Sequence, residues 1–103
     1  MAEKDFKERN PTEKLSDKEV SEQLLSLPGW KYEGGSIKKT YQTKHFPGTM
    51  GFVTAVGGFC QKANHHPDYV TMKYKEVEVS FSTHSAGGIT MNDINIAKEI
   101  ETI

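Results

Sequence analysis

The chain has 103 residues, of which 35% are hydrophobic and 26% charged, and a formal net charge of −1 at pH 7. This length fits one small domain with a modest core, and no apolar run approaches the roughly 20 residues of a membrane-spanning helix. Because Lys and Arg are interspersed with Asp and Glu, a basic nucleic-acid-binding surface is not expected. The single cysteine, Cys60, excludes an internal disulfide.

Residues 1–14 are mostly charged around a lone Phe6, and this composition predicts a flexible N-terminal tail. We expect one folded domain over residues 15–103. The N-terminus lacks the apolar segment of a secretory signal, so the cytoplasm is the expected location, with the nucleus as the alternative.

The first helix is predicted by a capping box, in which Ser16 precedes Glu19 by three positions. Pro28 and Gly29 predict where this helix stops. A β-hairpin is expected over residues 30–44, because the glycine pair at 34–35 supplies the positive φ angles of a tight turn.

A longer helix is predicted over residues 46–63, since Pro47 suits its first turn. Its apolar residues cover more than one face, so we expect it to contact the sheet and also a partner subunit. Gly51, Gly57 and Gly58 would each cost about 1 kcal/mol relative to alanine inside this helix. That cost predicts that something packs closely against the helix backbone there.

A second hairpin is predicted where apolar and polar residues alternate on both sides of residues 75–76. With those two residues as the turn, residues whose numbers sum to 151 face each other, and apolar side chains oppose apolar ones throughout. The same register places His84 opposite Pro67 and next to His66.

Thr90 and Asp93 form a second capping box, which opens a helix where Ile96, Ile100 and Ile103 share a face. The expected order is therefore helix, strand, strand, helix, strand, strand, helix. This order predicts an α+β fold, a four-stranded antiparallel sheet with helices packed on one face. The opposite face of the sheet would be polar and open to ligand or solvent.

Histidine is the side chain that most readily gains or loses a proton near neutral pH. Three of the four histidines, His65, His66 and His84, are predicted to meet at one strand end. They could be surface or packing residues, as His45 is expected to be, or ligands of a catalytic zinc. Against a metal, His65 and His66 are adjacent in an extended segment and point to opposite sides. Cys60, in the middle of a helix, is expected to be inert. We favour acid–base chemistry on a small polar molecule.

Residues 61–67, Tyr74, His84 and Asp93, together with segments 28–30 and 82–88, form a spaced pattern over most of the chain. This pattern closely resembles the signature of the pterin-4a-carbinolamine dehydratases, and the resemblance covers residues 15–103. It implies the fold predicted above and the activity of a 4a-hydroxytetrahydrobiopterin dehydratase. Such a hydro-lyase removes water from 4a-hydroxytetrahydropterin to give quinonoid dihydropterin, in tetrahydrobiopterin recycling, without metal or organic cofactor.

By this resemblance, His65, His66 and His84 are catalytic, with His65 and His84 as the principal acid–base pair. The residues expected at the pterin are Asn64, Pro67, Ser82, Thr83, Asp93, Trp30 and Gln61. Asp93 could equally be a capping-box carboxylate, and Trp30 could be a core residue.

Gln61 departs from the family pattern, which usually places an acidic residue four positions before the first histidine. On a continuing helix that residue would lie one turn back from His65 and would tune the charge of its imidazole. We therefore expect either a lower rate or compensation by another group, such as Asp93.

The resemblance also implies a homo-oligomer, a dimer or a tetramer, formed through the helix at residues 47–63. In animals the family has a second role as a dimerisation cofactor for a homeodomain transcription factor. A non-catalytic pterin-binding or protein-binding role is therefore the alternative function. Direct binding to nucleic acid or to a membrane is not expected.

Overall fold

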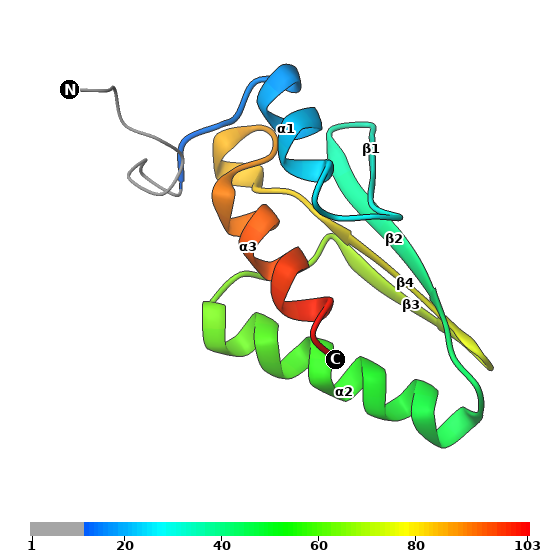
Figure 1. The fold of residues 1–103 in the computed structure, drawn as a ribbon. Helices are drawn as coiled ribbons and strands as arrows, with labels where there is room; N and C mark the ends of the chain where they lie inside the picture. Colours follow the sequence, from blue (N-terminus) through cyan, green and yellow to red (C-terminus); the bar gives the residue numbers. More distant parts are fainter. Residues whose placement is uncertain (1–11) are drawn as a thin grey trace.

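The structure is a computed structural model that describes residues 12–103. Its elements are α1 (Asp17–Leu24), β1 (Lys31–Glu33), β2 (Ser36–Gln42), α2 (Phe46–Ala63), β3 (Tyr69–Lys73), β4 (Glu76–Phe81), the 3₁₀ turn η2 (His84–Ala86) and α3 (Met91–Ile100). The strands form one antiparallel sheet in the order β1-β2-β4-β3. The three α-helices cover one face of this sheet (Figure 1). The predicted α+β fold is confirmed, whereas most of the predicted tail, residues 1–11, lies outside the described residues.

The core lies between the sheet and the helices. Strand β4 runs in the middle of the sheet, and its inward side chains Val77, Val79 and Phe81 have no exposed surface. Burial of such side chains is worth about 1.5–3 kcal/mol each and is the main force that holds the layers together. No helix within residues 12–103 is long and apolar enough to cross a membrane.

The capping box and the glycine turn predicted for the N-terminal part are both present. The Ser16 hydroxyl accepts the N–H of Glu19 at 3.1 Å, and the Glu19 carboxylate accepts the N–H of Ser16 at 2.8 Å. Helix α1 ends at Leu24, earlier than the predicted stop at Pro28, because the following residues make tighter i→i−3 hydrogen bonds. Strands β1 and β2 are joined by Gly34 and Gly35, whose φ angles are +58° and +80°.

The predicted register of the second hairpin is wrong by two residues. Val70 pairs with Val79 and Met72 with Val77, so the paired numbers sum to 149, and the turn residues are Tyr74 and Lys75. A shift of two residues keeps every side chain on its predicted face, so the alternation pattern alone does not distinguish the two registers.

Helix α2 determines which register is adopted. The Tyr74 ring stacks on Phe46 with centroids 5.8 Å apart, and the Tyr74 carbonyl accepts the Thr49 hydroxyl at 2.9 Å. These contacts fix Tyr74 in the turn against the start of α2. As a result, β4 ends at Phe81 and His84 leaves the ladder to open η2, so the predicted opposition of His84 and Pro67 is wrong.

Helix α2 begins and ends as its sequence predicts. The His45 ring nitrogen Nδ1 accepts the N–H of Gly48 at 2.9 Å, so this histidine caps the helix. Within this chain, the expected close packing at Gly51, Gly57 and Gly58 is wrong, because a Cβ built at each would meet nothing within 4 Å apart from the helix's own backbone. The glycine face of α2 is open.

Helix α3 has the predicted capping box at Thr90 and Asp93. Ile96 and Ile100 are buried, but Ile103 lies beyond the helix end and is 49% exposed, so it does not continue their face. The buried face of α3 is completed instead by Ile94 and Ala97.

Candidate active site

A pocket of about 460 Å³ is hollowed into the polar side of the sheet, where β2, β3 and β4 meet the segment before α3. Its lining comprises residues 34–36, Lys38, Asp68, Tyr69, Ser80, residues 82–84, Gly87 and Gly88. Of the residues predicted for the site, Ser82, Thr83 and His84 line this pocket directly.

His65 is placed by the end of helix α2. Asn64 adopts the left-handed conformation with φ of 52°, and the N–H groups of Asn64 and His65 donate to the carbonyls of Gln61 and Cys60 at 3.2 and 3.0 Å. This is a Schellman motif, for which asparagine is the common alternative to glycine. The chain reverses there and brings the His65 side chain to the start of α3.

His65 and Asp93 form a tight pair in a mostly buried setting. Nε2 of His65 lies 2.5 Å from Oδ1 of Asp93, and the two side chains are 11% and 0% exposed. The imidazole also stacks on the Phe81 ring, with centroids 6.1 Å apart. Packing and the carboxylate together fix the orientation of this ring.

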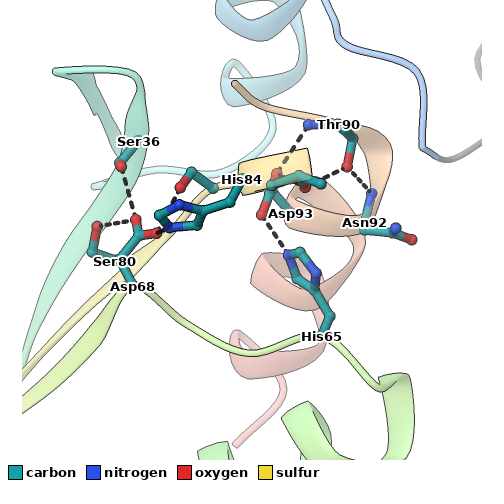
Figure 2. A network of polar contacts seen from close by, with 10 residues as sticks. Ser36, His65, Asp68, Ser80, His84, Thr90, Asn92 and Asp93 are labelled. Carbon is teal, nitrogen blue, oxygen red and sulfur yellow. Dashed lines mark hydrogen bonds and ion pairs between the residues drawn. The ribbon is translucent and has the colours of Figure 1, made fainter. Parts of the chain in front are cut away.

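Asp93 is the capping-box carboxylate of α3 and also the partner of His65. Its second oxygen accepts the N–H of Thr90 at 2.9 Å (Figure 2), and it also accepts the hydroxyl of Thr83 at 2.8 Å. The capping box and the contact with His65 therefore share one buried carboxylate. Thr83 precedes His84 in the chain, so this network also ties the position of His84 to that of His65.

His84 forms a second histidine–aspartate pair, with Asp68. Nε2 of His84 lies 3.3 Å from Oδ1 of Asp68, and the His84 side chain is 87% exposed. Asp68 also accepts the hydroxyls of Ser36 and Ser80 at 2.8 and 2.9 Å (Figure 2), and that of Ser82 at 2.6 Å. Burial alone would raise the pKa of Asp68, but these hydrogen bonds outweigh it and the pKa is lowered.

Asp68 and Ser36 were not predicted. Alternation along β3 would put Asp68 on the inner face with Val70. Instead the chain bends at Asp68, and its carboxylate accepts the hydroxyls of Ser80 in β4 and of Ser82 just after it. A signal was present in the sequence, since Ser80, Ser82 and His84 are spaced by two residues and Asp68 is the nearest carboxylate after the histidine pair.

The remaining predicted residues lie less centrally. His66, Asn64 and Gln61 are exposed, and Pro67 is half-buried beside them in the link to β3. Within the described residues none of these four side chains makes a hydrogen bond, so none joins Gln61 to His65. The expected one-turn spacing between Gln61 and His65 is wrong, because the left-handed Asn64 ends the helix between them.

Trp30 is a core residue and does not line the pocket. Its indole is 6% exposed, and its N–H donates to Glu101 at 3.1 Å on the helix side of the sheet. Lys39 and Tyr41 donate to the same oxygen of Glu101, so this cluster anchors the end of α3 to β2.

The donor set of the site suits proton transfer. No three His, Cys, Asp or Glu side chains within residues 12–103 are grouped so as to hold a metal ion. The two imidazoles instead each face one carboxylate, one pair buried and the other open to the pocket. Such an arrangement can position two proton-transfer groups on a bound molecule.

The chain is similar to proteins of one family. The family model described as pterin 4 alpha carbinolamine dehydratase matches residues 13–103. A relative from Roseiflexus sp. (strain RS-1) that carries the family's name is 40% identical over 90 residues, which cover 87% of this chain and 96% of the relative. Another from Nocardia farcinica is 38% identical over 92 residues, covering 89% and 96%.

Solved structures show the same fold. A transcriptional coactivator/pterin dehydratase from Brucella melitensis superposes with a TM-score of 0.81 at 31% identity, covering 86% of this chain and 96% of that one. A pterin dehydratase-like protein identified as a RuBisCO assembly factor in the α-carboxysome shares the fold at a TM-score of 0.60 and 11% identity, covering 71% and 83%. The chain belongs to the pterin-4α-carbinolamine dehydratase family.

Proposed function

We propose that this protein catalyses the loss of water from a 4a-hydroxytetrahydropterin, giving the quinonoid dihydropterin. The observation that carries the proposal is the pair of histidine–aspartate contacts, His65 with Asp93 and His84 with Asp68. Thr83 bonds to Asp93 and lines the pocket together with Asp68 and His84. Family membership supplies the substrate class.

The reaction requires two proton transfers and no change of overall oxidation state. The C4a–O bond breaks as the hydroxyl leaves as water, and the N5–H electron pair forms the C4a=N5 bond. A protonated imidazole gives its proton to the leaving hydroxyl, and a neutral imidazole takes the proton from N5. We propose His65 and His84 as this pair, with His66 binding the pterin or acting on the other substrate face.

The polar groups around the pocket are proposed to hold the pterin ring. Ser82 and Thr83 line the pocket, and Asn64 and Pro67 flank the histidine pair in the sequence. Asp93 is fully buried, so it acts on the substrate through His65. The buried position of Trp30 favours its core role over contact with the pterin.

The proposal is tested with chemically generated 4a-hydroxytetrahydropterin, by following dehydration by absorbance and subtracting the spontaneous rate. His65→Ala and His84→Ala are each expected to lower kcat by about 10²–10⁴-fold. His45→Asn is the matched control, because it removes a histidine outside the pocket and keeps a good helix cap. If both alanine variants kept most of the wild-type turnover, histidine catalysis would be wrong.

Family membership further supports a role in tetrahydrobiopterin recycling and catalysis without metal or organic cofactor. The composition of the N-terminus supports a cytoplasmic location.

We also propose that the open face of α2 is covered in a homo-oligomer. Phe46 and Met50 are 42% and 44% exposed, and further along the helix Gly51, Gly57 and Gly58 leave the backbone uncovered. The same face suits a different protein partner, which is the alternative function. A folded protein that binds pterin without accelerating dehydration would favour that alternative.

A further inference from the structure

Asp68 has no acceptor site left for a substrate. Its oxygen Oδ1 faces the Ser82 hydroxyl and Nε2 of His84, and its oxygen Oδ2 accepts the hydroxyls of Ser36 and Ser80. A carboxylate offers about four lone-pair sites, and these four contacts occupy them. Asp68 therefore lines the pocket without being available to bind the ligand that enters it.

The backbone of His84 is held in place, but its ring is open to solvent. The turn η2 and the Thr83–Gly88 bridge fix the chain beyond β4, whereas the imidazole is 87% exposed. An exposed side chain loses rotamer freedom only when a specific contact compensates that cost. Among the described residues, Asp68 is the only ion-pair or hydrogen-bonding partner of the His84 ring, and it leaves Nδ1 without such a partner.

We propose that Asp68 is the positioning residue of His84. It holds Nε2 of the imidazole and directs Nδ1 toward the substrate, in the same way that Asp93 holds Nε2 of His65. Ser36 of β2, Ser80 of β4 and Ser82 just after β4 fix the Asp68 carboxylate, so the orientation of the His84 ring is tied to the sheet. This inference rests on the proposed dehydration for its kinetic consequences and on the geometry for its structural ones.

The kinetic test compares the wild type with Asp68→Asn and Asp68→Glu. Asp68→Asn is expected to lower kcat by about 10–100-fold, the usual effect of losing a partner that orients a functional histidine, and to change KM by less than about threefold. Asp68→Glu keeps the charge and is expected to recover part of kcat. Glu76→Gln is the matched control, because it neutralises another β4-hairpin carboxylate at the far end of the strand from the pocket.

A double variant separates positioning from general support of the fold. If Asp68 acts through His84, then Asp68→Asn adds less than about twofold to the loss caused by His84→Ala, since coupled residues are not additive. If Asp68→Asn costs the same factor with and without His84, or raises KM while kcat is unchanged, the inference is wrong.

A second measurement needs neither a variant nor activity. NMR relaxation of the His84 ring C–H bonds in the wild type is expected to give an order parameter near the value of about 0.85 found for rigid backbone, despite the exposure of the ring. A value below about 0.6 would overturn the inference. If the wild type shows no dehydratase activity, the proposed function fails, and this measurement still decides whether Asp68 holds His84.

Discussion

At the scale of single residues, the two proposed catalytic histidines differ in their surroundings. His65 is stacked on Phe81 and paired with a fully buried carboxylate, whereas His84 is open to solvent above the pocket. A carboxylate held in a dry environment interacts more strongly with its partner than one exposed to water. The structure therefore gives His65 the more rigid place and His84 the more accessible one.

Asp93→Asn tests whether one carboxylate serves both the fold and the site. An amide offers one oxygen in place of two, so either His65 or the Thr90 N–H loses its acceptor. We expect the free energy of unfolding to fall by about 1–3 kcal/mol and kcat to fall at least about tenfold. Urea denaturation and the dehydration assay measure the two effects, and a variant as stable and as active as the wild type would contradict this role.

Gln61→Glu tests the departure from the family pattern. Because Gln61 is exposed and is separated from His65 by the helix end, a new carboxylate there would act across solvent. Exposed charge pairs contribute at most about 1 kcal/mol, so we expect kcat to rise by no more than about fivefold. A much larger increase in kcat would show that residue 61 influences the charge of the His65 imidazole, and that Asp93 does not compensate for the missing acidic residue.

At the scale of elements, the helix and strand patterns in the sequence predicted the fold correctly but did not predict all the contacts of the site. Both capping boxes, the glycine turn and the start of α2 are local patterns, and all of them form as predicted. The hairpin register depends on Tyr74 packing against α2, which is a contact between distant segments. The predicted register placed His84 opposite Pro67, so the contact between His84 and Asp68 was not predicted.

Thr49→Val tests this contact between α2 and the hairpin. The buried Thr49 hydroxyl donates to the Tyr74 carbonyl at 2.9 Å and shares a hydrogen bond with Thr43. Valine has a similar shape and leaves both partners unsatisfied, so we expect a loss of about 1–3 kcal/mol. Thermal unfolding beside the exposed control Thr54→Val would measure it, and equal stability of the two variants would mean that the contact does not fix the turn.

At the scale of the whole molecule, Glu101 ties the end of the chain to the sheet. Burial would raise its pKa, but hydrogen bonds from Lys39, Tyr41 and Trp30 outweigh this effect and the pKa is lowered below 4.5. A lowered pKa means that the folded state favours the ionised form, so this stabilisation is present above pH 4.5 and is lost as the pH falls through the folded pKa.

Glu101→Gln is therefore expected to lower Tm most near neutral pH. The difference in Tm from the wild type should shrink as the pH falls below about 4.5, because the wild type then becomes protonated as well. Calorimetry at a series of pH values measures this, and a difference that grows toward acid pH would contradict the sign.

The open face of α2 gives a prediction about assembly. Gly58→Arg places a charged side chain on that face without disturbing the pocket. We expect light scattering to show a wild-type oligomer and a variant shifted to the single chain. A wild type that stays a single chain at every concentration would contradict the proposed interface.

The central claim is that the protein is a dehydratase, and its most direct test is the wild-type rate of water loss from 4a-hydroxytetrahydropterin over the spontaneous background. We predict an acceleration of at least about 10²-fold, the contribution of one positioned acid–base group, that collapses in His84→Ala. A folded wild type that binds pterin but leaves the spontaneous rate unchanged would contradict the claim, and would make the α2 face the place to look for its function.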